Sequence, residues 1–124
     1  MGIRLIKISA AYFAIGVLIG YYMSTAHNYE LTPVHVHINL LGWTSLTLAG
    51  ILYQLFPTLG ENKLAKAHFW LHNIGLPVMM IGLALMILLR NEQFVPIVAI
   101  GGTFTALAVL TFSFNVIKNL KPSS

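Results

Sequence analysis

Residues 67–89 read AHFWLHNIGLPVMMIGLALMILL and contain no Asp, Glu, Lys or Arg. The stretch is longer than the roughly 20 residues that an α-helix needs to cross a hydrocarbon core of about 30 Å. Three further charge-free runs of similar or greater length cover residues 8–29, 31–60 and 93–117. The sequence therefore predicts four transmembrane helices.

The composition agrees with a chain that lies almost wholly in the bilayer. Of the 124 residues, 57% are hydrophobic and 8% are charged, whereas about 25% of the residues of a soluble domain are charged. We expect an all-α integral membrane protein, a bundle of four transmembrane helices that forms one domain over residues 1–124. The predicted spans are about 6–25, 33–56, 64–89 and 95–117.

The basic residues predict the orientation of the spans. Six of the seven cluster in three regions that share one side of the membrane, before the first span, between the second and third, and after the fourth: Arg4, Lys7, Lys63, Lys66, Lys118 and Lys121. The positive-inside rule makes that side cytoplasmic. We expect both termini in the cytoplasm and the chain in a bacterial inner membrane. The net charge of +4 then reports topology and not nucleic-acid binding.

Some classes of function are disfavoured by residues that the spans lack. The three carboxylates, Glu30, Glu61 and Glu92, all fall in predicted loops, and no predicted span has a basic residue at its centre. Proton pumps and ion-coupled transporters usually need ionisable groups inside the membrane. The chain has no cysteine, which excludes thiolate metal sites and covalent haem attachment.

Five histidines are the main candidates for chemistry. His27, His35 and His37 fall at the outer ends of the first two spans, and His68 and His72 fall at the cytoplasmic end of the third. At 1.5 Å per residue the two groups are about 15–20 Å apart along the membrane normal. We therefore expect that they do not share one metal ion within a chain.

His35 and His37 are two residues apart, a rotation of about 200° on an α-helix. They point to nearly opposite faces, which is wrong for chelating one ion but suits a helix between two cofactors or two neighbouring subunits. Asn39 adds a third polar side chain. Imidazole is a common ligand of haem iron and copper. The alternative is that these side chains hydrogen-bond to headgroups or backbone.

The remaining histidines carry weaker signals. His68 and His72 are four apart and share a helix face, a spacing that suits either a metal or a structural role with Trp70 as an interfacial anchor. Of the two, His72 is the better ligand candidate because it lies deeper and close to Pro77, which frees a backbone carbonyl. His27 lies in a short loop and is a candidate for an extra outer ligand.

Two stretches carry a family resemblance. HVHINLLGW at residues 35–43, continuing to Tyr53 and Pro57, resembles the catalytic-subunit superfamily of haem–copper oxidases and nitric oxide reductases. KLAKAHFWL at residues 63–71 is similar to the opening of the eleventh helix of that superfamily, where the histidine is not normally a haem ligand. The two stretches occur in the family's order.

The resemblance implies an assembly. Those subunits have twelve helices in three pseudo-equivalent arcs of four, and a four-helix chain resembles one arc. The implied protein is a homotrimer resembling haem–copper oxidase subunit I, with b-type haem between adjacent subunits. Its axial ligands would be His37 of one subunit and His35 of the next. The family's copper site needs three further histidines in other arcs, which a symmetric trimer does not supply, so copper, oxygen reduction and proton pumping are not carried over.

Three functions remain as expectations. The first is a haem protein that transfers electrons to or from a redox partner, or binds a diatomic gas such as NO or O2. The second is a small oxidoreductase of nitric oxide reductase type, with a second metal beside the haem and His27 as a candidate ligand. The third is a non-catalytic structural or assembly protein whose histidines only contact lipid and backbone.

Overall fold

The computed structural model of the chain describes residues 1–122, and every regular element in that part is helical. Four stretches are long and apolar enough to cross a bilayer: α1 (Gly2–Ala26), Thr32–Leu55, α5 (Lys63–Leu89) and Glu92–Asn119. Each lies within a few residues of its predicted span. The all-α architecture with four long apolar helices is confirmed, and it indicates an integral membrane protein.

The second span is not one regular α-helix, which the sequence had predicted over residues 33–56. It consists of α2 (Thr32–His37), a π-helical segment η1 (Ile38–Thr44) and α3 (Ser45–Leu55). In η1 the Ser45 N–H donates to the carbonyl of Leu40, five residues earlier, and the Ser45 hydroxyl donates to the same oxygen at 2.7 Å. π-Helical turns are rare and frequently lie at functional sites.

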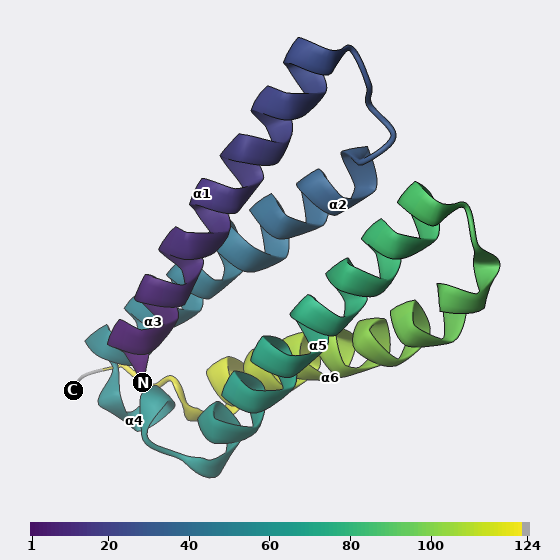
Figure 1. Cartoon of the computed structure of the whole chain (residues 1–124). Helices are drawn as coiled ribbons and strands as arrows, with labels where there is room; N and C mark the ends of the chain where they lie inside the picture. The colour runs from purple at the N-terminus through teal and green to yellow at the C-terminus, as the bar shows by residue number, and fades with distance from the viewer. Residues whose placement is uncertain (123–124) are drawn as a thin grey trace.

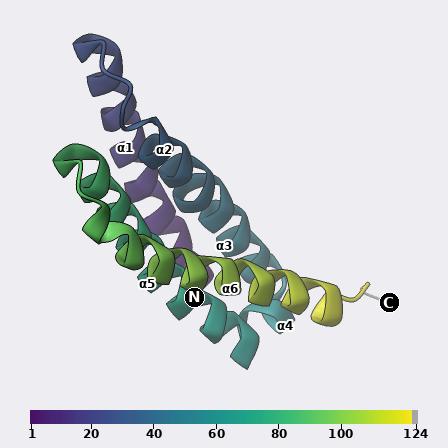
Figure 2. The ribbon, with the colours of Figure 1, turned by 90° about the vertical axis from the view of Figure 1, so that its right-hand side faces the viewer.

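The four spans form two hairpins (Figure 1). In the first, α1 packs on the composite second helix; in the second, α5 packs on α6 (Val95–Asn119), with the short η2 (Glu92–Phe94) at the turn. The one-turn helix α4 (Pro57–Gly60) connects the hairpins. The start of α1 and the end of α6 lie at the α4 end (Figures 1 and 2), so the structure gathers the basic regions at one end, as the charge pattern predicted.

Glycines allow the helices of each hairpin to approach closely. A Cβ built on Gly101 would collide with the Met79 backbone nitrogen, so no side chain fits between α5 and α6 there. Gly16 and Gly20 of α1 contact the side chains of Asn39 and His35. Small residues at such crossings let membrane helices gain packing and polar contacts.

A buried core joins the two hairpins in the half of the molecule next to α4. Its members come from α1, α3, α4 and α5: Leu5, Leu46, Ala49, Tyr53, Leu59, Ala65 and Phe69. Asn115 of α6 is fully buried beside it; its amide donates to the carbonyl of Leu59 at 3.0 Å and its oxygen accepts from Asn62 at 2.8 Å. Asn62 in turn caps α5 by accepting from the Ala65 N–H. These polar contacts therefore hold the start of α5 and the end of α6 against α4.

Substituting Gly101 by Ala is expected to destabilise the second hairpin by about 2 kcal/mol, because overpacking forces the two backbones apart. The matched control is Gly102→Ala, since a Cβ at Gly102 meets only the Met79 sulfur, at 3.4 Å. Thermal unfolding in detergent should show a lower midpoint for Gly101→Ala alone. Equal midpoints for the two variants would contradict the packing described.

Candidate functional site

His37 ends α2 at the start of the π-helical segment, and one of its ring nitrogens is held by the backbone. Its Nδ1 lies 2.6 Å from the carbonyl oxygen of Pro33, one turn earlier. A carbonyl can only accept, so Nδ1 carries the proton and donates it. In the neutral ring Nε2 is then left with a free lone pair, the form in which histidine binds a metal.

A groove of about 440 Å³ lies beside that ring. It is formed by the second span together with α5 and α6, and its lining is almost entirely apolar: His37, Leu41, Met79, Gly102, Thr105, Ala106, Val109 and Leu110. The only other polar side chain, Thr105, donates its hydroxyl to the Gly101 carbonyl at 2.8 Å. One imidazole in an apolar groove is an arrangement that suits a large, flat, hydrophobic ligand bound through a metal.

His35 faces a different neighbour from His37, as their spacing predicted. Its ring packs against Gly20 of α1 in the same chain, and the Asn39 amide donates to its Nε2 at 3.3 Å. The Nδ1 atom of His35 and the Oδ1 atom of Asn39 are buried and have no hydrogen-bond partner among the described residues. His35 is thus engaged within its own chain, on the opposite side of the helix from the groove.

His68 and His72 belong to a chain of hydrogen bonds in the protein interior. The Tyr53 hydroxyl lies 2.8 Å from Nδ1 of His68, and Nε2 of His68 lies 3.2 Å from Nδ1 of His72. Nε2 of His72 lies 2.9 Å from the carbonyl oxygen of Leu41, in η1. Both histidines are at most 2% exposed. The chain links α3, α5 and the π-helical segment.

The acceptor at the end of this chain fixes the direction of every bond. Because the Leu41 carbonyl only accepts, Nε2 of His72 must donate, and its Nδ1 in the neutral ring accepts from Nε2 of His68. Nδ1 of His68 then accepts from the Tyr53 hydroxyl. No ring nitrogen of the pair keeps a free lone pair for a metal. The hydrogen-bonded chain also ends at the Leu41 carbonyl, which cannot pass on a proton. Its geometry is therefore that of a structural connection between the two hairpins.

The structure thus sorts the histidines that the sequence singled out. The shared face of His68 and His72 is confirmed, and both are engaged in structural contacts. His27 is exposed at the left-handed residue that ends α1, with φ 49°, and does not line the groove. Trp70 is 61% exposed near the α4 end of α5, where an interfacial aromatic residue is expected.

Two members of the interior chain were missed from the sequence, namely Tyr53 and the Leu41 carbonyl. Tyr53 could have been considered from its depth, because it lies four residues before α4 and His68 lies eight residues after it, both near the same end of the bundle. The role of Leu41 depends on the π-helical segment, for which the sequence gives no signal. Within residues 1–122 no three His, Asp or Glu side chains gather to hold a metal ion by themselves.

Comparisons with known protein families, with curated proteins and with solved structures yield no match.

Replacing His72 by Leu should loosen the π-helical segment, because the Leu41 carbonyl and the Nε2–H of His68 both lose their partner. We expect amide hydrogen exchange of residues 38–45 to rise about tenfold, the effect of one or two buried hydrogen bonds. Mass spectrometry of peptides from the two hairpins measures this.

The control is Asn73→Ala, which removes only a bond to the Phe69 carbonyl within α5. If amide exchange of residues 38–45 rises equally in both variants, or in neither, the hydrogen bond from His72 to Leu41 does not hold this segment.

Proposed function

We propose that the chain is a membrane b-type haem protein in which Nε2 of His37 binds the iron and the protein transfers electrons or binds a diatomic gas. The observation that carries the proposal is the 2.6 Å contact of His37 Nδ1 with the Pro33 carbonyl beside an apolar groove. A metal-binding histidine almost always donates its other ring N–H to a carbonyl, carboxylate or water, which orients the ring. The family resemblance of residues 35–43 suggested the same residue.

The other histidines support the choice of His37 by contrast. The nitrogens of His68 and His72 are all engaged, and Nε2 of His35 accepts from Asn39. His27 is exposed outside the groove. Among the histidines around the spans, His37 alone combines a bare nitrogen with an apolar groove of about 440 Å³. Bound haem would supply an iron that changes oxidation state or takes a gas; the chain would supply the ligand and a water-poor surrounding.

The proposal includes a homotrimer in which a neighbouring copy closes the groove. The groove residues Ala106, Val109 and Leu110 are exposed in the single chain, as are many large apolar side chains of the spans. In a trimer each chain would bury this surface against the next one. The resemblance places haem at such boundaries, and three equivalent grooves would then hold three haems.

Whether the iron would have a second histidine ligand decides between the two activities. His35 of the neighbouring copy would be that ligand if its ring left Gly20 and Asn39, and two imidazoles would favour electron transfer. With His35 in its observed place, His37 would be the only histidine that holds the iron, which would favour gas binding. The contacts of His35 support the second arrangement.

The purified protein should show a Soret band that shifts on reduction, and His37→Ala should abolish it because the ring nitrogen is lost. His68→Ala should keep the band, since that ring has no free nitrogen. Absorption spectra of oxidised and reduced protein, with haem content per chain, test this. A colourless wild-type protein, or a band that survives in His37→Ala and vanishes in His68→Ala, would overturn the proposal.

Carbon monoxide should shift the Soret band of the reduced wild-type protein, because His37 would be the only histidine that holds the iron. An optical titration measures the shift, and His35→Ala serves as the matched variant. If the band moves only in His35→Ala, then His35 is a tightly bound ligand and electron transfer is the better assignment.

A further inference from the structure

A cavity at the α4 end of the molecule brings together two cations from different hairpins. It measures about 360 Å³ and is lined by Met1, Arg4, Lys66, Phe69 and Trp70. Arg4 comes from α1 and Lys66 from α5, and the lining contains no Asp or Glu. Two like charges that converge on one cavity repel each other, and a bound anion offsets that repulsion.

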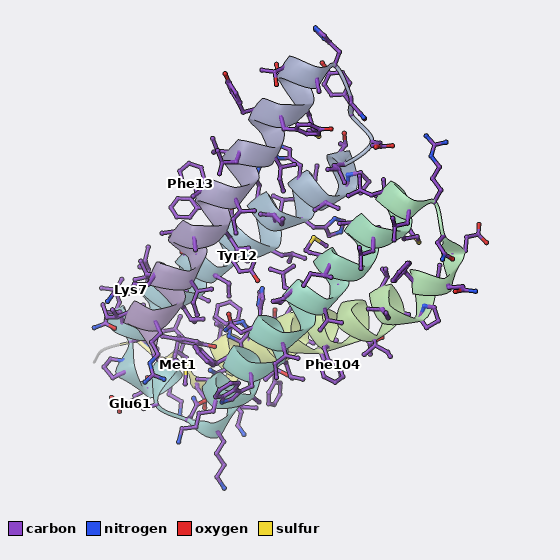
Figure 3. The ribbon with its side chains drawn as sticks, in the orientation of Figure 1. Met1, Lys7, Tyr12, Phe13, Glu61 and Phe104 are labelled. Atoms are coloured by element: carbon purple, nitrogen blue, oxygen red, sulfur yellow. The ribbon has the colours of Figure 1, made fainter. Side chains whose placement is uncertain are left out.

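A second cavity follows the same two helices deeper into the membrane. It measures about 590 Å³, and its lining is mostly apolar: Ile8, Ala11, Tyr12, Ile15, Ile38, Asn73, Pro77, Met80 and Ile81. Figure 3 shows Tyr12 pointing from α1 toward α5, whereas Phe13 points to the other side. The cavity therefore lies between the hairpins, on the face of α1 from which Tyr12 points toward α5.

Helical spacing places the two cavities one after the other on the same faces of α1 and α5, and we call them together the α1–α5 groove. Their α1 residues follow each other in steps of three or four: Arg4, Ile8, Ala11 and Ile15. Their α5 residues do the same: Lys66, Trp70, Asn73, Pro77 and Ile81. Residues at such steps lie on one face of a helix. The groove thus runs from a cationic mouth to an apolar interior.

The dimensions of the groove match one leaflet of a bilayer. Arg4 and Ile15 are eleven residues apart, a distance of about 16 Å at 1.5 Å per residue. That is close to half of a hydrocarbon core of about 30 Å. The cationic mouth lies at the end where α1 begins and α6 ends, and most of the basic residues belong to that end.

We infer that the α1–α5 groove binds one anionic phospholipid of the leaflet on that side. Arg4 and Lys66 take the phosphate, since a guanidinium donates two parallel hydrogen bonds to phosphate and an ammonium adds a point charge. Trp70 lies at headgroup level, and an acyl chain follows the surface of Ile8, Ile15 and Pro77. The lipid would join the hairpins on the side away from the His37 groove. This inference does not depend on the proposed haem.

Charge favours a lipid over a second copy of the chain in this groove. Of the three side-chain carboxylates in the sequence, only Glu61 belongs to the end with the cationic mouth, whereas six basic residues belong to that end. Another copy would therefore bring mainly positive charge to Arg4 and Lys66. Basic pockets between transmembrane helices at the cytoplasmic boundary bind anionic headgroups in other membrane proteins.

Native mass spectrometry of the full chain in a non-ionic detergent tests the inference. The probe is an equimolar mixture of phosphatidylglycerol and phosphatidylcholine with the same acyl chains. We expect one phosphatidylglycerol per chain in preference to phosphatidylcholine. In Arg4→Gln/Lys66→Gln that preference should fall by about 30-fold, which corresponds to about 1 kcal/mol for each basic residue.

Three further arms separate the alternatives. Lys118→Gln/Lys121→Gln removes two charges at the same end but outside the groove and should leave the preference unchanged. Ala11→Trp should fill the apolar part of the groove and weaken the binding of phosphatidylglycerol. Inorganic phosphate at millimolar concentration should not compete with the lipid. Four results would overturn the inference. The two lipids could be retained equally, both double variants could lose the preference equally, or phosphate could compete efficiently. In the fourth, Ala11→Trp would change the oligomeric state without changing lipid retention.

Discussion

A neutral imidazole has two ring nitrogens and carries its proton on one of them. Where water is scarce, this N–H group is stabilised by donating a hydrogen bond to an acceptor. Backbone carbonyls accept such hydrogen bonds from His37 and His72. The Pro33 carbonyl accepts from Nδ1–H of His37, which leaves Nε2 bare at the groove. The Leu41 carbonyl accepts from Nε2–H of His72, so Nδ1 of His72 accepts from His68. The same rule thus yields one histidine able to bind a metal and two that hold the fold.

The π-helical segment connects these two outcomes. Leu41 lines the groove of His37 with its side chain and accepts the proton of His72 with its carbonyl. Gly42, the next residue, lies against the ring of Tyr12, so α1 approaches the segment from the other side. A displacement of either hairpin would therefore reach the turn that follows His37. The position of His37, the proposed ligand, therefore depends on how both hairpins pack against the π-helical segment.

Much of the fold could be predicted from the sequence, because charge and apolar length dominate in a membrane chain. The four spans and the shared end of the basic regions follow from such patterns. The opposed directions of His35 and His37 followed from rotation per residue. The π-helical segment could not be predicted, since an extra residue in a turn leaves hydrophobic composition unchanged. The bonds of His68 also depended on which helix faces α5, which composition does not specify.

The central claim is that hydrogen bonds leave His37 with a bare Nε2 while the interior pair keeps its protons on Nε2. NMR spectra of the haem-free protein, labelled with ¹⁵N in its histidine rings and assigned by single substitutions, measure this directly. The account predicts an Nδ1–H ring for His37 and Nε2–H rings for His68 and His72 at neutral pH. An Nε2–H ring at His37, or an Nδ1–H ring at His72, would contradict it.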